Sequence, residues 1–144
     1  MEYLAENLRK LDEEEVLALG VDVLSTLEES AHYSETVYVI DVSGKPAGIL
    51  GAATYRDGKW ALWMLGTDEI TQLSRQFLRY SKPMIRRLFD ETGAQQFFNY
   101  TYAKNKLHHR WLEWCGADLG TIPQHIGPHN KAFLPFTIQK EAYV

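Results

Sequence analysis

The sequence lacks several features that mark particular protein classes. Cysteine occurs once, at Cys115, so no intrachain disulfide can form and a reducing compartment is expected. No apolar run approaches the roughly 20 residues of a membrane-spanning helix. Basic residues number 15 against 19 acidic ones, which argues against nucleic acid or an anionic membrane as the main partner. The opening stretch MEYLAENLRKLDEEE is acidic where a signal peptide is basic and then apolar, so a cytoplasmic protein is expected.

What the chain does contain is typical of one globular domain. Its 144 residues are 45% hydrophobic and 24% charged, and a chain of this length buries roughly two-thirds of its unfolded surface. No internal repeat, low-complexity tract or domain linker is found in it. A single domain spanning residues 1–144 is therefore expected.

The first half of the chain changes from helical to strand periodicity. Apolar residues recur at helical spacing from residue 3 to about 29, with Asp12 as the expected N-cap of an acidic first turn. Gly20 is expected to separate two helical pieces, the second beginning near Asp22. The runs TVYVIDV, AGILGAATY and WALWML, joined by turn residues, predict an antiparallel meander over about residues 36–65.

Four further elements are expected after the meander. A helix should follow the meander, capped by Thr67 or Asp68 and kinked or divided at Pro83, with these apolar positions: Ile70, Leu73, Phe77, Leu78, Met84, Ile85 and Leu88. AQQFFNYTYA predicts a central strand with aromatic residues on both faces. A helix from Asn105 to Cys115 comes next, and a long loop or hairpin then ends in a strand. Gly48 and Gly51 indicate a bulge, or another element packed closely against the second strand.

This order and the helix AKNKLHHRWLEWCGA resemble the GNAT superfamily of acetyl-CoA-dependent N-acyltransferases. Its members typically have a helix that starts at Asn, carries Tyr seven residues later and ends in Gly-Phe. Asn105, Leu112, Gly116 and Ala117 occupy those positions here. The resemblance implies an α/β fold with a mixed central sheet, helices on both faces and a splayed, V-shaped cleft.

The closer resemblance is to small GNAT-like proteins of tailed bacteriophages, some of them described as internal virion proteins. Five collinear blocks carry it between about residues 4 and 140: D-x-x-E-V-x-A-L-G from Asp12 to Gly20, W-x-L-G-T-D from Trp63 to Asp68, F-L-R from Phe77 to Arg79, N-x-x-x-x-R-W-L-x-W-x-G from Asn105 to Gly116, and P-F at Pro135 and Phe136. The resemblance implies that the partners are phage structural proteins. It also implies a location in the host cytoplasm, with packaging in the virion as an alternative location.

In such a fold the strands ending near Leu65 and Ala103 splay apart and expose backbone groups that receive the acyl-pantetheine arm. The residues that the resemblance assigns to cofactor binding are Met64, Leu65, Gly66, Thr67, Gln72, Arg75 and Asn105. The phosphate loop GTDEITQLSRQF lacks the usual G-x-G glycines and carries Asp68 and Glu69 where phosphate charge should lie. Acetyl-CoA binding is therefore expected to be weak or absent.

The general acid of the superfamily is also missing, because Leu112 stands in place of the helix tyrosine. Tyr100, Tyr102 and His108 are weak replacement candidates, as are His109 and Cys115, if the fold brings one within about 3 Å of the reacting atoms. Asn105 is either a plain N-cap or a cap that also contacts a ligand. No histidine pair has metal-ligand geometry, and solvated histidines are expected.

Two functions follow from these observations. One is a phage-encoded GNAT-like protein that serves as a virion or morphogenesis component, with a degraded acyl-CoA site and no catalysis. The alternative is an active acetyl-CoA-dependent N-acetyltransferase that acts on an amine acceptor. The helix after the meander carries a run of basic residues: Arg75, Arg79, Lys82, Arg86 and Arg87. This run is expected to face solvent, and the alternative is that it docks to an acidic partner.

Overall fold

The computed structural model describes residues 1–55, 57–72 and 74–143, the side chain of Ser74 excepted. In chain order the elements are α1 (Glu2–Asn7), α2 (Lys10–Ala18), α3 (Val23–Tyr33), β1 (Thr36–Val42), β2 (Lys45–Thr54), β3 (Trp60–Gly66), α4 (Asp68–Gln72), α5 (Ser74–Thr92), β4 (Gln96–Tyr102), α6 (Lys106–Trp114), β5 (Asp118–Leu119), β6 (Gln124–Ile126), β7 (Lys131–Gln139) and a 3-10 helix, η1 (Lys140–Tyr143). None of the described helices is long and apolar enough to span a bilayer.

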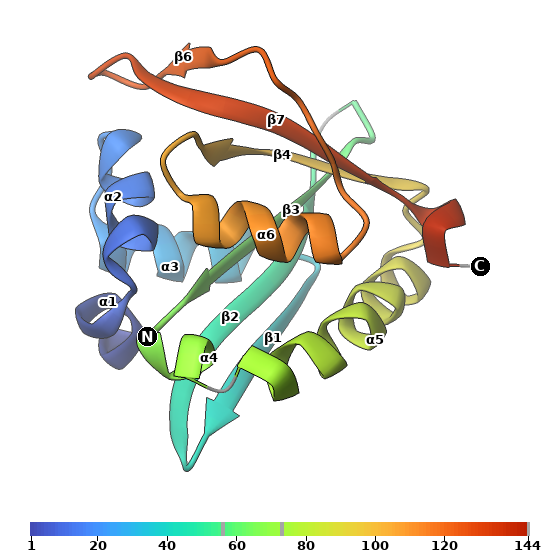
Figure 1. Cartoon of the computed structure of the whole chain (residues 1–144), viewed down its shortest axis with the longest axis horizontal. Helices are drawn as coiled ribbons and strands as arrows, with labels where there is room; N and C mark the ends of the chain where they lie inside the picture. Colours follow the sequence, from blue (N-terminus) through green and yellow to red (C-terminus); the bar gives the residue numbers. More distant parts are fainter. Residues whose placement is uncertain (56, 73, 144) are drawn as a thin grey trace.

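The strands form one mixed seven-stranded sheet in the order β1-β2-β3-β4-β7-β5, with β6 also paired to β7 (Figure 1). β3 and β4 run parallel, whereas the other described strand pairs are antiparallel. The predicted α/β architecture with a mixed sheet is confirmed, and so is the antiparallel meander β1-β2-β3.

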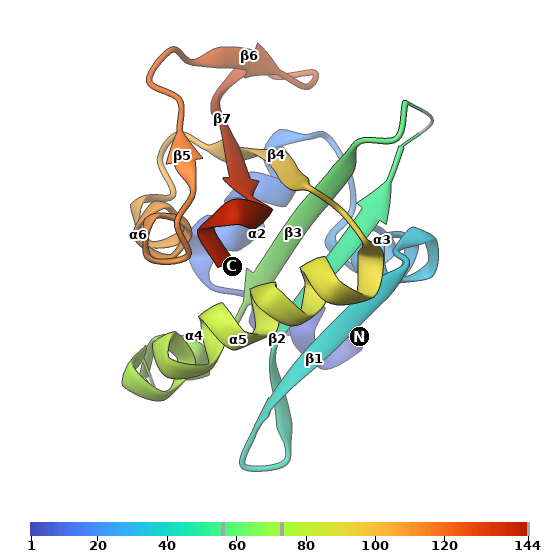
Figure 2. The same cartoon turned by 90° about the vertical axis from the view of Figure 1, so that its right-hand side faces the viewer.

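Period-two alternation along β2 and β3 gives the sheet two apolar faces, and one layer of helices covers each face (Figures 1 and 2). Leu50 and Leu62 belong to a core shared with α5 and α6. Ile49 and Leu65, which are one and three residues away from them along the strands, belong to a core shared with α1, α2 and α3. The helices that precede the sheet and those that follow β3 therefore lie on opposite faces.

The two glycines inside β2 make room for large side chains. A Cβ at Gly48 would lie 2.2 Å from Cδ1 of Ile70 on α4, and one at Gly51 would lie 2.6 Å from the Trp63 indole. The prediction of a closely packed element is therefore confirmed at both positions. A register irregularity between β1 and β2 also occurs, at Ile40–Asp41.

Several local predictions need correction. Arg9, not Asp12, is the N-cap of α2, and Asp12 lies in the first turn with its side chain turned inward. The predicted boundary at Gly20 is confirmed, and Asp22 caps α3 by accepting a hydrogen bond from Ser25 N at 3.0 Å. Pro83 lies inside α5, which continues from Ser74 to Thr92, so the helix is not divided there. Leu73, one of the predicted apolar positions, is outside the described residues.

Candidate functional site

The sheet opens between its two parallel strands. β3 and β4 pair only at Trp60–Phe97 and Ala61–Phe98, although the strands continue to Gly66 and Tyr102. Beyond that short contact they diverge as the two arms of a V (Figure 1). The splay predicted near Leu65 and Tyr102 is therefore confirmed.

Alternation along each arm decides which backbone groups face the V. In an antiparallel ladder, a residue directs its N–H and C=O to the same side, and the side changes at each residue. The backbone groups of Gly66 and Leu62 form hydrogen bonds inside the V. The N–H and C=O of Met64, two residues from each, therefore also point into the V. On β4, Tyr100 and Tyr102 use their N–H groups there.

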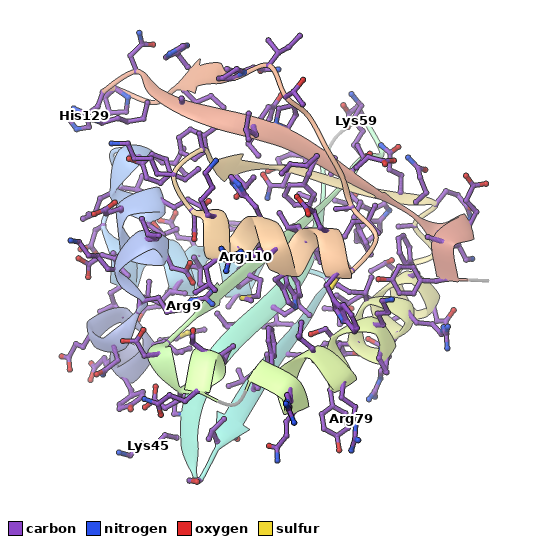
Figure 3. All side chains as sticks on the ribbon, in the orientation of Figure 1. Arg9, Lys45, Lys59, Arg79, Arg110 and His129 are labelled. Atoms are coloured by element: carbon purple, nitrogen blue, oxygen red, sulfur yellow. The ribbon has the colours of Figure 1, made fainter. Side chains whose placement is uncertain are left out.

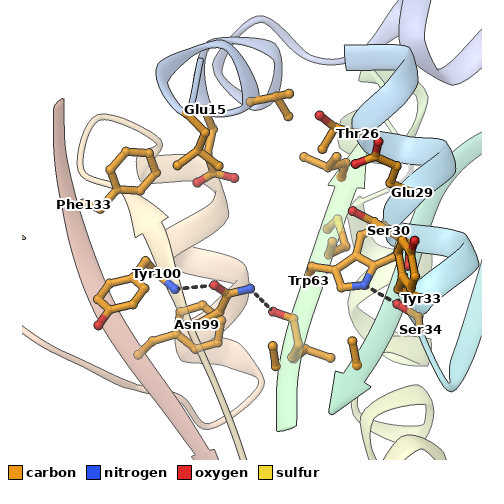
Figure 4. A pocket seen from close by; sticks show the side chains of 18 of the residues that line it. Glu15, Thr26, Glu29, Ser30, Tyr33, Ser34, Trp63, Asn99, Tyr100 and Phe133 are labelled. Atoms are coloured by element: carbon orange, nitrogen blue, oxygen red, sulfur yellow. Dashed lines mark hydrogen bonds between the residues drawn. The ribbon is translucent and has the colours of Figure 1, made fainter. Parts of the chain in front are cut away.

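At the apex of the V, the side chain of Asn99 bridges the arms in place of a strand. Its Nδ2 donates to Leu62 O on β3 at 2.9 Å, and its Oδ1 accepts from Tyr100 N on β4 at 2.8 Å (Figure 4). A carboxamide has the same donor and acceptor as a peptide group, so it satisfies both arms at once.

At the mouth of the V, Asp12 of α2 joins the β3 arm to the start of α6. Its Oδ2 accepts from Gly66 N at 2.8 Å, and its Oδ1 accepts from Nδ2 of Asn105 at 2.9 Å. Arg9 forms a buried ion pair with the same carboxylate at 2.9 Å, and Arg9 N donates to Gly66 O at 2.9 Å. Both side chains are over 90% buried, so the charge of Asp12 is neutralised inside the protein.

Glu15, one turn later on α2, binds the other arm. Its Oε1 accepts from Tyr102 N at 2.6 Å and from the Thr101 hydroxyl at 3.4 Å. Desolvation is the main cause that raises the pKa of Glu15 to about 7, and the nearby charge of Asp12 adds to it, while the bond from Tyr102 N opposes it. Glu15 therefore titrates near neutral pH.

The start of α6 completes the mouth. Asn105 is buried and caps the helix by accepting from His108 N at 3.4 Å. Tyr102 O accepts from Asn105 N at 2.9 Å and lies 3.0 Å from Nε2 of His109. The expectation of solvated histidines is wrong for this pair, since His108 and His109 are each only 5% exposed. The apolar face of α6 carries both rings into the protein.

A cavity of about 460 Å³ lies beside the V on the side of α2 and α3 (Figure 4). Its wall includes Trp63, whose indole N–H donates to Oγ of Ser34 at 2.8 Å. Glu15 and His108 supply titratable groups to the same space. Nδ1 of His108 has no hydrogen-bond partner among the described residues, and burial lowers its pKa to about 4.

The candidate acids are distributed as follows. Tyr100 and His108 line the cavity, and Tyr100 is 39% exposed. Tyr102 is buried, with its ring 5.6 Å from that of Phe133, and it is not among the residues that line the cavity. Cys115 lies in the core, where burial raises the pKa of its thiol to about 12. Leu112 is fully buried.

The residues assigned to cofactor binding are spread from the cavity to the starts of α4 and α5. Met64 and Leu65 line the cavity, while Gly66 and Asn105 are bonded to Asp12. The others lie further along the chain: Thr67 N donates to Ala47 O at 2.8 Å, and Gln72 and Arg75 are exposed on α4 and α5.

Glu69, in the acidic first turn of α4, is hydrogen-bonded to other residues of the protein. Glu69 accepts from the Tyr3 hydroxyl at 2.7 Å and also from the Thr67 hydroxyl. These two hydrogen bonds, that from Thr67 first, lower the pKa of Glu69 and keep it charged. Carboxylates therefore stand both at the start of α4 and at the mouth of the V.

Sequence reasoning missed the three side chains that fill the V: Asp12, Glu15 and Asn99. One signal could have identified the first two. They are three residues apart on α2, so they share one helix face, and Val16 and Leu8 place that face toward the core. Carboxylates on the apolar side of a helix require partners inside the protein.

No protein-family model matches the sequence, and no curated protein matches it. Solved structures do. A putative acetyltransferase covers 97% of this chain and 78% of its own, with a TM-score of 0.72 at 15% identity. An aminoglycoside acetyltransferase in complex with coenzyme A matches over 99% of this chain and 88% of its own length, with a TM-score of 0.66 and 17% sequence identity. A Bacillus subtilis acetyltransferase in complex with CoA matches over 80% of this chain and 82% of its own length, with a TM-score of 0.61 and 12% sequence identity.

The chain has the GNAT acetyltransferase fold. At these identities the likeness establishes the fold and the position of the V within it. The closing of the V by Asp12, Glu15 and Asn99 is a feature of this chain's own side chains.

Proposed function

We propose that this protein is a non-catalytic member of the GNAT fold, a virion or morphogenesis component of a tailed bacteriophage that works in the host cytoplasm. The observation that carries the loss of catalysis is the hydrogen bonding inside the V. Asp12 binds Gly66 N at 2.8 Å on one arm, and Glu15 binds Tyr102 N at 2.6 Å on the other. Backbone groups that could receive a pantetheine arm are thus already bonded to side chains of α2.

Charge supports the same proposal. Coenzyme A is a polyanion, and the helix that follows β3 begins with Asp68 and Glu69. Glu69 is held in its charged form by Thr67 and Tyr3. A phosphate at this helix start would meet like charge instead of free N–H groups. Acetyl-CoA is therefore expected to bind weakly or not at all.

The phage assignment rests on the five collinear blocks from Asp12 to Phe136. The hydrogen bonds made by the first block support a structural role for it. Asp12 and Glu15 of that block join α2 to β3, β4 and α6. A scaffold retained for its shape needs such internal bonds more than it needs an open channel. Phage structural proteins are the proposed partners.

A second candidate, an acetyl-CoA-dependent N-acetyltransferase, is favoured by one observation. Met64 lies between the filled apex and the filled mouth, and no side chain of the described residues bonds its backbone. The cavity opens at this point and holds His108 and Glu15. The aminoglycoside and Bacillus subtilis structures that share the fold are complexes with coenzyme A.

Titration with CoA and acetyl-CoA separates the two functions. A ligand present at 100 times its dissociation constant stabilises the folded state by about 2.7 kcal/mol, which raises the melting temperature measurably. We expect no shift from either compound in physiological salt, and no release of free thiol from acetyl-CoA with amine acceptors. Micromolar binding by the unmodified protein would overturn the non-catalytic proposal.

A further inference from the structure

Charge is divided between the two faces of the sheet. Residues 2–33, which form α1, α2 and α3, contain nine acidic and two basic residues. The helices α5 and α6 together contain seven basic and three acidic residues. Because these two layers pack on opposite faces of the sheet, the protein has one acidic face and one basic face.

The basic face, defined here as the exposed surface of α5 and α6, has cations in a continuous stripe. Exposed residues at positions i, i+4, i+7 and i+11 of α5 form it: Arg75, Arg79, Lys82 and Arg86. None of these four forms a salt bridge within the described part of the chain, whereas Arg87 is held by Glu91 at 2.8 Å. Lys106 and Arg110 extend the face along α6, and Figure 3 shows Arg79 and Arg110 on these two helices.

Exposed aromatic side chains lie among these cations. Tyr80 is 60% exposed on α5 and Trp114 is 46% exposed on α6. Nζ of Lys82 lies 4.7 Å from the centre of a Trp114 ring, which joins the two helices at the surface. Arginine and aromatic residues are enriched at protein interfaces, so this composition fits a protein partner with acidic groups.

The acidic face, defined as the exposed surface of α1, α2 and α3, has the complementary composition. Its exposed carboxylates include Glu2, Glu6, Glu13, Glu28 and Glu29, and Lys10 is its exposed cation. Asp12 and Glu15 are used inside the V and are not part of this face. Leu17 and Val21 add apolar surface, since they are 48% and 43% exposed.

We propose that the acidic face of one copy of this chain docks on the basic face of the next. The two faces cannot meet within one molecule, because the sheet lies between them. Like faces repel, so a two-fold dimer through either face is disfavoured, and the contact is head-to-tail. Nucleic acid is a poorer occupant of the basic face, since the opposite face and the net charge of −4 repel a polyanion. The contact does not depend on the state of the V.

Sedimentation velocity of the full chain at two ionic strengths tests the proposal. The screening length is about 30 Å at 0.01 M salt and about 3 Å at 1 M. At the lower ionic strength we expect a weight-average mass at least twice the 16.6 kDa of one chain, falling to the single-chain mass at the higher one. A protein that stays at the single-chain mass in low salt contradicts the proposal.

Charge reversal identifies the faces. The basic-face variant Arg79→Glu with Arg86→Glu should remain at the single-chain mass. The matched control Lys59→Glu with Lys131→Glu should associate, because it changes the net charge by the same amount but leaves the basic face intact. Association by the basic-face variant, or its loss in the control, overturns the proposal. Circular dichroism checks folding, and Arg79→Ala with Arg86→Ala replaces any variant that unfolds, with the same expected loss.

Mixing two variants tests the identity of the partner. The acidic-face variant Glu13→Lys with Glu28→Lys should also be monomeric alone, because both of its faces are then basic. A one-to-one mixture with the basic-face variant should recover the mass at low salt, since each supplies the face that the other has lost. A mixture that stays monomeric shows that the basic face takes some other acidic partner and overturns the proposal.

Discussion

Asp12 accepts a hydrogen bond from Gly66 N at 2.8 Å, although 54 residues separate the two along the chain. The same carboxylate pairs with Arg9 and bonds to Asn105, so one buried side chain ties α2 to β3 and α6. A buried charge of this kind is tolerated only when each of its partners is present. The mouth of the V is consequently an internal, cooperative network.

The first prediction concerns that network. Asp12→Ala should destabilise the protein by about 3–5 kcal/mol, because it leaves the Arg9 guanidinium buried without a partner. Urea denaturation monitored by tryptophan fluorescence measures the change. The control is Asp57→Ala, which removes an exposed ion pair with Lys59 and should cost less than about 1 kcal/mol. Equal losses in the two variants would show that the buried network does not stabilise the fold.

The second prediction concerns the apex of the V. Asn99→Asp keeps an acceptor for Tyr100 N but loses the donor to Leu62 O, whereas Asn99→Ala loses both bonds. The bond to Leu62 O is part-buried and that from Tyr100 N is exposed, so each loss should cost less than the roughly 1–3 kcal/mol of a buried unpaired group, and both variants should be less stable than the unmodified protein. Thermal unfolding provides the measurement. Unchanged stability in Asn99→Ala would mean that solvent satisfies both arms without the side chain.

The third prediction is a pH dependence at Glu15, whose pKa rises from 4.5 to about 7 in the folded protein. Between these values the folded state holds a proton that the unfolded state has released. The resulting stability is present below about pH 4.5 and is lost as the pH rises to about 7. Glu15→Gln cannot titrate, so its free energy of unfolding relative to the unmodified protein should increase across this window.

Comparison with the variant is needed because His108 titrates in the same range. Its pKa is lowered to about 4, so the unfolded state takes up a proton first, and stability falls as the pH falls from about 6.5 toward 4. This contribution is common to both proteins and cancels in the difference. Urea unfolding at several pH values measures it, and a difference that does not vary with pH would contradict the raised pKa of Glu15.

How far the sequence predicts this molecule depends on the range of the interactions. The meander and the boundary at Gly20 follow from local periodicity and turn residues. The position of the V follows from a fold-level resemblance. The residues that close it do not follow from either, because Asp12 contacts Gly66 and Asn105 only after the chain has folded. An acidic first turn of a surface helix normally points to solvent, and the apolar Val16 on the same helix face is the local sign that this one does not.

The histidines and Pro83 show the same limit. His108 and His109 were expected in solvent, but the packing of α6 on α5 and β4 turns both rings inward. Pro83 was expected to kink or divide its helix, yet α5 continues through it from Ser74 to Thr92. Tertiary packing of Ile85, Leu88 and Phe89 stabilises that segment beyond its local propensity.

The fourth prediction concerns Leu112, which stands in place of the helix tyrosine. Its side chain is fully buried in the core with Leu62 and Met64. Leu112→Tyr should therefore destabilise the protein by about 1–3 kcal/mol through overpacking. It should not produce acetyl transfer, because the arms of the V remain bonded to α2. Thiol release from acetyl-CoA measures transfer, and turnover by this single variant, with a silent parent, would show that the acid was the only defect.

The last prediction concerns the charge at the start of α4. Asp68→Asn with Glu69→Gln removes two negative charges from the place where CoA phosphates would lie, so CoA should bind more tightly to this variant than to the unmodified protein. The gain should shrink as salt rises, because surface electrostatics are screened. Calorimetric titration at low and high salt measures it, with Asp57→Asn plus Asp118→Asn as a variant of equal charge elsewhere on the chain. If that control gains as much, the effect is net charge alone. If neither gains at low salt, the side chains of α2 in the V, not the acidic turn, exclude the cofactor. Glu15→Ala, which removes the group bonded to Tyr102 N, then becomes the substitution that should admit it.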